Sequence, residues 1–242
     1  MSLQVAICQP HYIPWIGYFE MIDRVDEFIF LDDVDVIQRD WKTRNRIRKE
    51  RESNETKWLS VPIVHECRRQ TPISKARIGG DGTWQQRHLD AFSMVYAQTP
   101  HYDEAKTLFG ECLEQPATTI GDLNVEMVQR TCAYLGIETP MRRASETPTD
   151  GCKTEKLATL CEFAKATAYL ANNGSAGYLE PERFAASGLT LAFQDYEHPT
   201  YEQLNGKEAL PFLSHLSILD LIANHGPASL AILRQGRPTY AT

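Results

Sequence analysis

The residues best suited to chemistry are concentrated near the start of the chain, where polar, cationic and indole side chains follow two short apolar runs. They are Gln9, His11, Tyr12, Trp15, Asp32, Asp33, Gln38, Trp41, Lys42, Arg44, Asn45 and Arg46. Arginine, lysine and the N-terminus of a helix bind phosphate, and adjacent carboxylates bind magnesium or a ribose. The combination is typical of a phosphate or nucleotide site. A strand end beside a solvated charged surface would give the same pattern without any function.

Two apolar runs and one helical pattern position these residues. Residues 5–8 and 28–31 read as strands, and the apolar spacing from Trp15 to Ile22 predicts a helix between them. A strand, a helix and a strand in this order form a βαβ unit with a right-handed crossover and a parallel sheet. In such a sheet the polar residues after both strands lie at the carboxyl edge, which is where ligands bind.

A small-residue loop places further candidates at the same edge. Residues 172–178 follow a strand predicted at 168–171, and they include Asn173 and Gly174. Backbone N–H groups of such a loop can cradle an anion at a helix N-terminus. An ordinary turn between a strand and a helix explains the loop equally well.

The last candidates are His198 and Tyr201, which follow a strand predicted at 189–193. His198 is close to Asp195 in sequence and could act as a general base, although a hydrogen-bonded loop histidine is the commoner case. We expect the segments around Gln9, Asp33, Arg44 and His198 to meet in one crevice.

The whole pattern predicts one α/β domain spanning residues 1–242, with a doubly wound, mostly parallel, Rossmann-like sheet and additional helices. Residues 83–136 are expected to form a helical packing layer. Residues 64–82 are expected to form a flap or hairpin insertion, with a weak strand at 73–78.

The remaining elements are read from local patterns. Residues 47–56 read as a loop, and a strand at 57–63 is expected at the sheet edge because it contains Pro62. Further helices are predicted at 84–98, 102–114, 119–136, 153–166, 179–187 and 217–224, and a further strand at 141–144.

Composition and charge narrow the function classes. The 242-residue chain carries a formal net charge of −7, which argues against a general affinity for nucleic acid; the basic segment 42–51 is only local. No apolar run approaches the roughly 18 residues of a membrane span and no signal peptide precedes Val5, so we expect a cytoplasmic protein. The common nucleotide-binding, zinc-protease and serine-hydrolase motifs are absent.

Six cysteines show neither a C-x-x-C pair nor the spacing of zinc ligands, so most are expected to be small core residues. Cys8 differs because it ends the first predicted strand beside the proposed site. A nucleophilic role for Cys8 would need an activating base, for which His11 is the nearby candidate.

The chain resembles the WbqC-like protein family nearly from end to end. The longer matching motifs are Q-P-x-Y-x-P-W-x-G-Y-F from Gln9, F-L-D-D-V from Phe30, W-K-T-R-N-R-I from Trp41, W-L-S-V-P-I from Trp58, K-T-E-K-L from Lys153 and L-S-I-L-D-L-I-A-N-H-G from Leu216. The shorter matches are Trp84 with His88, Tyr178 with Leu179, and H-P-x-Y-x-Q from His198. Many members carry His directly before Gln-Pro, where this chain has Cys8.

The resemblance implies a setting more than a reaction. Members commonly occur with genes for surface polysaccharide, O-antigen, lipopolysaccharide or related cell-envelope sugars. The first βαβ unit is also similar to that of HUP-class nucleotidylyltransferases, in which an H-x-G-H tetrapeptide opens the helix. Residues 15–18 occupy that place, and both imidazoles that steady the transferring phosphate are absent. Lysine, arginine and the helix dipole would have to replace them.

Position and family setting together predict a transferase that binds a nucleotide or nucleotide-sugar in surface-polysaccharide precursor synthesis. Its most concrete version is ATP-dependent acyl or aminoacyl transfer to an amino sugar, with ATP or another nucleotide and magnesium as cofactors. The catalytic candidates are His11, Asp33, Arg44 and His198. In this version His11 shuttles a proton, Asp32 and Asp33 hold magnesium or ribose, and Arg44 and Arg46 hold phosphates.

A hypothesis from another class is a non-catalytic ligand-binding or scaffold protein of the same pathway. In either case the expected partner is a small molecule, a nucleotide-sugar or an amino sugar. We expect no nucleic-acid partner and no membrane span. A homo-oligomer is compatible with the sequence.

Overall fold

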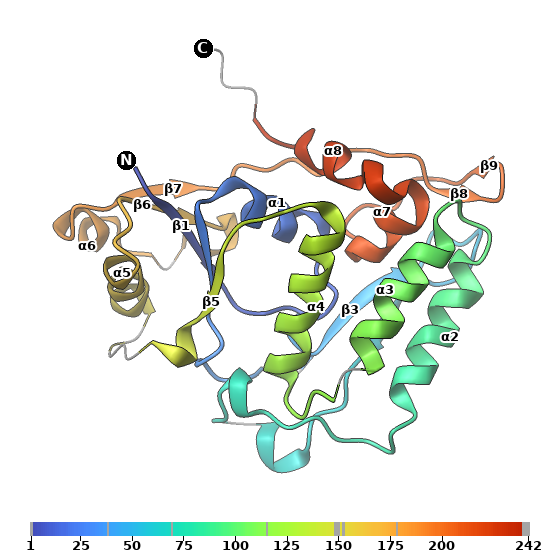
Figure 1. Cartoon of the computed structure of the whole chain (residues 1–242), viewed down its shortest axis with the longest axis horizontal. Coiled ribbons are helices and arrows are strands. Elements are labelled where there is room, and N and C mark those ends of the chain that lie inside the picture. The colour runs from blue at the N-terminus through green and yellow to red at the C-terminus, as the bar shows by residue number, and fades with distance from the viewer. Residues whose placement is uncertain are drawn as a thin grey trace.

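The computed structural model describes residues 2–37, 39–68, 70–114, 116–147, 151, 153–177 and 179–238. Its centre is a five-stranded sheet in which every pair of neighbours is parallel, in the order β5-β2-β1-β6-β7 (Figure 1). The strands are β1 Gln4–Cys8, β2 Glu27–Phe30, β5 Met141–Arg143, β6 Ala168–Ala171 and β7 Thr190–Phe193. The chain begins in the middle strand, winds outward to β5 and returns to the other side at β6. This confirms the expected Rossmann-like α/β fold and its first βαβ unit.

Apolar side chains alternate between the two faces of the sheet. Ala6, Phe28 and Leu170 face the larger core, which also contains side chains of α1, α4 and α7, while Val5 and Tyr169 face a smaller core beneath α5 and α6. A parallel sheet covered on both faces needs apolar residues on both sides of each strand. The helices are α1 Ile16–Arg24, α2 Trp84–Tyr96, α3 Tyr102–Glu114, α4 Ile120–Leu135, α5 Lys153–Phe163, α6 Pro181–Ala186, α7 Ile218–His225 and α8 Ser229–Arg234.

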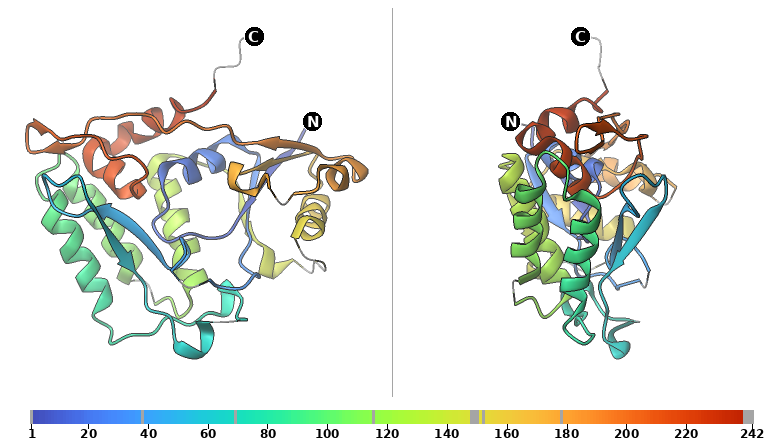
Figure 2. Two further views of the ribbon diagram at one scale, coloured as in Figure 1. Left: turned by 180° about the vertical axis from the view of Figure 1, so that it is seen from behind. Right: turned by 90° about the vertical axis from the view of Figure 1, so that its right-hand side faces the viewer.

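A separate antiparallel hairpin lies outside the central sheet (Figure 2). Its strands are β3 Arg44–Arg48 and β4 Thr56–Ser60. The predicted loop at 47–56 was therefore wrong at both ends, because Ile47, Arg48 and Thr56 lie in strands. The strand expected at the edge of the main sheet pairs instead with β3. The physical reason is the alternation of β3, which buries Asn45 and Ile47 toward the protein and turns the arginines at 44 and 46 outward. The last short strands, β8 Leu204–Asn205 and β9 Glu208–Ala209, and helix α8 were not predicted.

The segment 64–82 forms two short 3₁₀-helices, His65–Arg68 and Ile73–Lys75, so the strand expected at 73–78 was wrong. Ile63, just before this segment, forms an antiparallel bridge with Ile78 within it. Ile73 is fully buried, and the N–H of Ser74 donates to the Asp32 carbonyl at 2.8 Å. These contacts bend the segment toward the carboxyl end of β2 and prevent an extended strand.

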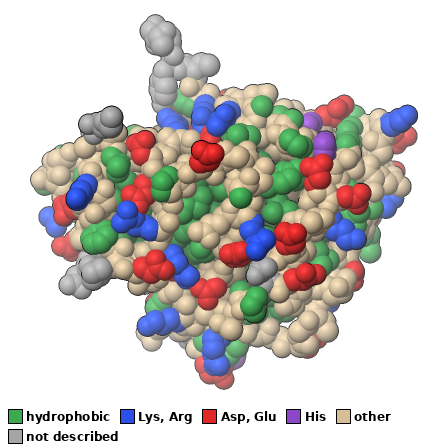
Figure 3. All heavy atoms as spheres, viewed as in Figure 1, with side chains coloured by type: hydrophobic (Ala, Val, Ile, Leu, Met, Phe, Trp, Pro, Cys, Tyr) green, Lys and Arg blue, Asp and Glu red, His purple; other side chains and the backbone are tan. Residues whose placement is uncertain are grey.

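The helical layer follows the sequence closely. Helix α3 has the predicted bounds, and α4 is capped as expected, with Thr119 Oγ1 accepting the Asp122 N–H at 3.1 Å and Gly136 left-handed at φ 76°. Helices α2, α3 and α4 pack side by side (Figure 1). On this face acidic and basic side chains are interspersed (Figure 3). Within the described residues, every helix is too short or too polar to cross a bilayer.

Candidate functional site

The strand order reverses between β1 and β6, so the chain leaves these neighbouring strands toward opposite faces of the sheet. Beyond β1 lies the loop of residues 9–14, and beyond β6 lies the 3₁₀ turn Asn173–Ser175. In open parallel sheets, ligands bind in the crevice that such a reversal creates beyond the carboxyl ends. Asn173 and Gly174 are exposed in this turn, at the predicted edge.

A buried lysine organises the loop after β1. Lys42 is 2% exposed, and its Nζ donates to Gln9 Oε1 at 2.6 Å and forms an ion pair with Asp40. Asn124 on α4 joins the loop after β1 to the segment that contains Lys42, because its Nδ2 donates to the carbonyls of Pro10 at 2.9 Å and Lys42 at 2.8 Å. The structure thus brings together the predicted residues Gln9 and Lys42. Asp40 was missed, although its position two residues before Lys42 was a usable signal.

Burial and the Lys42 charge set the protonation of the neighbouring groups. Burial, followed by the Lys42 charge, lowers the pKa of His11 to about 4, and burial raises the pKa of the Cys8 thiol to about 12. Burial alone would raise the pKa of Asp40, but the hydrogen bond and charge of Lys42 outweigh it and leave the pKa low. At neutral pH His11 is therefore uncharged, Cys8 is a thiol and Asp40 is a carboxylate. His11 can accept a proton or a hydrogen bond, but it cannot hold a phosphate by charge.

The two adjacent aspartates at the end of β2 have separate partners. Asp32 is fully buried and accepts hydrogen bonds from Arg143 Nε at 2.6 Å and from the N–H and Oγ of Ser145 at 2.9 and 2.8 Å. Asp33 pairs through Oδ2 with Lys156 Nζ at 2.5 Å, while its Oδ1 is buried and has no partner in the part of the chain that the structure describes. Lys156 was missed because nothing local in the sequence couples α5 to β2.

The aspartates do not form a magnesium site in this arrangement. Asp32 is saturated by Arg143 and Ser145, so only one carboxylate oxygen of the pair remains open. No three His, Cys, Asp or Glu residues among those described are placed to hold a metal ion.

Of the candidates on β3, Asn45 has a structural role, whereas Arg44 and Arg46 lie on the outer side of the hairpin. Asn45 is buried, and its Nδ2 donates to the carbonyls of Tyr12 at 3.1 Å and Ile13 at 2.8 Å, so it fixes the loop after β1 to the hairpin. The guanidinium of Arg44 lies 4.1 Å from the ring centre of Trp58, and that of Arg46 lies 5.9 Å from the ring centre of Trp41. Gln38 lies outside the described residues.

Three aromatic candidates use their polar atoms in structural bonds. His198 Nδ1 donates to the Pro199 carbonyl at 2.9 Å and its Nε2 accepts the His215 N–H at 3.1 Å, while burial lowers the pKa of His198 to about 4. The Tyr201 hydroxyl donates to Asp220 at 2.8 Å, and the Tyr12 hydroxyl bonds His88 Nδ1 at 2.8 Å. Neither ring nitrogen of His198 is left to serve as a base.

The tetrapeptide of residues 15–18 also has a packing role. The ring of Trp15 stacks on His215 at a centroid distance of 5.2 Å and on His198 at 6.0 Å, and the Tyr18 hydroxyl donates to the Gln9 carbonyl at 3.0 Å.

Three of the four regions that were expected to meet form one chain of contacts, from Gln9 through Lys42 and β3 to His215 and His198. The Asp33–Lys156 pair lies beyond the adjacent strand β2.

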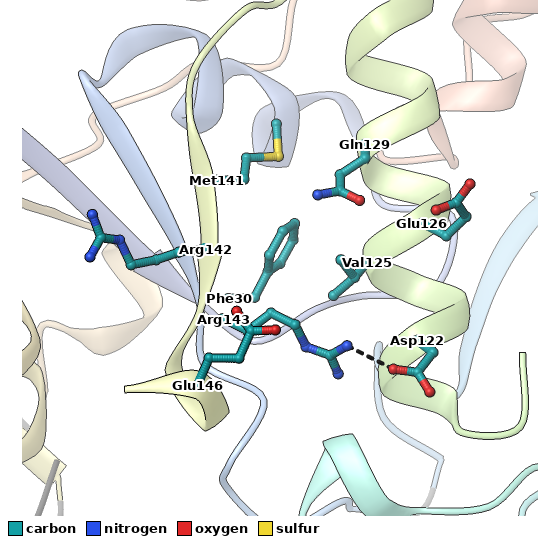
Figure 4. Close-up of a pocket in the computed structure, with 9 residues that line it drawn as sticks. All are labelled: Phe30, Asp122, Val125, Glu126, Gln129, Met141, Arg142, Arg143 and Glu146. Carbon is teal, nitrogen blue, oxygen red and sulfur yellow. Dashed lines mark hydrogen bonds and ion pairs between the residues drawn. The ribbon is translucent and has the colours of Figure 1, made fainter. Parts of the chain in front are cut away.

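A hollow of about 340 Å³ lies between α4 and β5 (Figure 4). Arg143 points across it to Asp122 at 2.7 Å, whereas Arg142 points away toward the opposite face of the sheet. The hollow borders the Asp32–Arg143 pair but contains none of the predicted site residues.

The doubly wound parallel sheet, with a buried lysine at its carboxyl edge, defines a Rossmann-like α/β protein. The chain belongs to the WbqC-like protein family, which it matches over residues 9–232. A protein of Mycobacterium tuberculosis (strain ATCC 25618 / H37Rv) with the name Uncharacterized protein Rv1507c is 36% identical over 237 residues, which cover 97% of this chain and 99% of that protein. No solved structure matches the chain.

The buried histidines predict a loss of stability in mild acid. His88 is 6% exposed, and burial lowers its pKa from 6.5 to about 4. The unfolded chain therefore takes up this proton first, so stability is complete above about pH 6.5 and is lost as pH falls toward 4. The cost is roughly 3 kcal/mol for His88, and His11 acts in the same direction. Urea unfolding between pH 7 and pH 4.5 measures this loss of stability. The role of His88 is contradicted if the unfolding midpoint stays constant over this range, or if the midpoint of His88→Gln falls with pH as steeply as that of the parent chain.

Gly17 is required because the indole of Trp15 lies against the backbone of α1. A Cβ at Gly17 would come within 2.3 Å of the Trp15 ring. We expect Gly17→Ala to displace the indole and to destabilise the fold by about 1–3 kcal/mol, although alanine favours helix. Gly110→Ala on α3 is the control, since its Cβ would meet only Leu89 at 3.9 Å. Urea unfolding compares the two variants, and equal stability of both would contradict the packing role.

Proposed function

We propose that this protein is a cytoplasmic group-transfer enzyme that binds a nucleotide or nucleotide-sugar at the carboxyl edge of its sheet. The observation that supports this most is the buried Lys42, which Gln9 and Asp40 hold at the end of β1, next to the reversal of strand order. An ammonium group has three N–H donors. Among the described residues, Gln9 and Asp40 accept two of them, and the third would donate to a phosphate oxygen.

The surrounding groups suit the transfer of an acyl or phosphoryl group. Lys42 would stabilise negative charge on a phosphate, and the neutral His11 would accept a proton from the attacking group. Asp33 Oδ1, which is buried and has no hydrogen-bond partner among the described residues, would accept a hydrogen bond from a hydroxyl of the ligand. The family's occurrence with surface-polysaccharide genes suggests precursor synthesis as the setting, and ATP-dependent acyl or aminoacyl transfer to an amino sugar as the concrete reaction.

Isothermal titration of the full chain with ATP, CTP and nucleotide-sugars, each with and without magnesium, tests the proposal. We expect one of these ligands to bind with one site per chain. The absence of binding by all of them at millimolar concentration would contradict it.

A non-catalytic ligand-binding or scaffold protein is the second candidate, and one observation favours it. Asp32, His198 and Tyr201 direct their polar atoms into structural hydrogen bonds. Under this alternative, Asp33→Ala and Arg44→Ala leave partner binding and pathway output intact, whereas the enzyme proposal requires that pathway output fall in both.

A further inference from the structure

Two exposed indoles lie together on the outer side of the β3–β4 hairpin. Trp41 is 42% exposed and Trp58 is 40% exposed, and their ring centres are 5.4 Å apart. Among the described residues, only three other large apolar side chains are as exposed, and tryptophan is costly to leave in water. Adjacent exposed aromatic rings indicate a surface that contacts another molecule.

Two guanidinium groups without an anionic partner accompany these rings. Arg44 stacks on Trp58 and Arg46 lies over Trp41, and among the described residues neither contacts a carboxylate. Within the described ranges, Arg44 Nε is buried without a partner, and Arg46 Nε donates to the His215 carbonyl at 3.1 Å. Arginines held on aromatic faces with free N–H donors are suited to bind a carboxylate or a phosphate.

The hairpin holds this indole–guanidinium face (Trp41, Arg44, Arg46 and Trp58) in a fixed arrangement. The antiparallel register places Arg46 directly opposite Trp58 and Arg44 opposite Ser60. The Trp41 carbonyl accepts the Tyr12 N–H at 2.9 Å, which ties the face to the loop after β1. A site on paired strands is preorganised, so little ordering is needed when a ligand binds.

We propose that this face binds the second substrate, a sugar whose ring packs on the indoles and whose phosphate or carboxylate group is bound by Arg44 and Arg46. The inference rests on the proposed function, in which Lys42 binds the nucleotide and this face presents the acceptor. The C–H face of a pyranose packs on a single open indole, whereas a nucleobase is best held between parallel rings. Trp41 and Trp58 are tilted by 43°, and Arg44 already covers one side of Trp58. Among the described residues, this face presents the two guanidinium groups of Arg44 and Arg46, and the whole chain carries a net charge of −7. This charge distribution fits a small anion better than a polyanion.

Titration of the full chain with glucose 1-phosphate, glucuronate and glucose tests the inference. We expect at least one of the two anionic sugars to bind and glucose to bind at least about tenfold more weakly. If only glucose 1-phosphate binds, the ligand of this face is a sugar phosphate. If only glucuronate binds, the ligand is a sugar acid. Trp58→Ala and Arg44→Gln should each weaken this binding roughly 10- to 100-fold. Phe163→Ala is the matched control, because Phe163 is 50% exposed beneath Arg142, whose guanidinium is paired with Glu27.

Failure of the inference is separable from failure of the proposed function. The inference is overturned if neither anionic sugar binds, if glucose binds equally well, or if Trp58→Ala and Arg44→Gln bind like the parent chain. It is also overturned if Lys42→Met abolishes sugar binding, since the sugar would then occupy the nucleotide site. Nucleotide binding that persists in Trp58→Ala would leave the proposed function standing in each of these cases.

Discussion

Lys42→Met is expected to weaken nucleotide binding about 100-fold. The Lys42 ammonium is buried beside the end of β1, and its donors are shared between the protein and the proposed phosphate. Losing a charge-assisted hydrogen bond costs about 1.5–3 kcal/mol, and 2.7 kcal/mol corresponds to a factor of roughly 100. Gln9 and Asp40 also lose their shared partner, so their side chains are no longer fixed. Titration of the variant with the nucleotide that the parent chain binds measures the effect.

Two further variants separate the loss of the ligand contact from a loss of folding. Lys57→Met makes the same change at an exposed position on β4 and should leave nucleotide affinity unchanged. Lys42→Arg keeps the charge and should retain part of the affinity if the fold is intact by circular dichroism. Equal affinity in Lys42→Met and Lys57→Met would show that Lys42 has only a structural role.

Arg48→Met and Asp220→Ala should each destabilise the protein by about 3–5 kcal/mol. Arg48 and Asp220 are both 1% exposed, and Gln203 bridges them, accepting from Arg48 Nη2 at 2.6 Å and donating to Asp220 at 2.8 Å. Asp220 also accepts hydrogen bonds from the hydroxyls of Tyr96 at 2.9 Å and Tyr201 at 2.8 Å. Removing one member of a buried charged network leaves the others desolvated and unpaired. The network joins β3 to α2 and α7, so its loss loosens the strand that carries Arg44 and Arg46.

Urea unfolding of the single and double variants tests this network. The double variant should lose less free energy of unfolding than the sum of the losses in the two single variants, by at least about 1 kcal/mol. Arg87→Met is the matched control, because its exposed guanidinium contacts Asp81 at 3.3 Å on the surface and should contribute less than about 1 kcal/mol. Additive losses, or losses no larger than that of Arg87→Met, would contradict the account.

The sequence predicted the elements whose signals are local. Helix α4 carries its own N-cap at Thr119 and its own left-handed glycine at 136, so both of its ends were correct within a residue. Strands β1, β2 and β6 are apolar runs covered on both faces, which the sequence displays directly. The period-two signal in β3 was present but was obscured by its arginines, which face outward or pair within the protein.

The candidate site was only partly predictable, because its contacts join distant segments. Gln9 and Lys42 were both selected: the order of the first βαβ unit placed Gln9 at the carboxyl edge, and Lys42, which follows the unit, was expected to close over that edge. The order of the first βαβ unit does not reveal the partners of the two aspartates. Arg143, the partner of Asp32, is 111 residues away in sequence. Lys156, the partner of Asp33, lies on helix α5, far along the chain from β2. His198 was selected by residue type, and only the structure shows that both of its ring nitrogens are already bonded.

A crystal structure of the full chain with a bound nucleotide tests the central claim most directly. We expect a phosphate oxygen within hydrogen-bond distance of Lys42 Nζ, in the crevice beyond β1 and β6. A nucleotide bound in the hollow between α4 and β5, or anywhere with Lys42 contacting only Gln9 and Asp40, would contradict it.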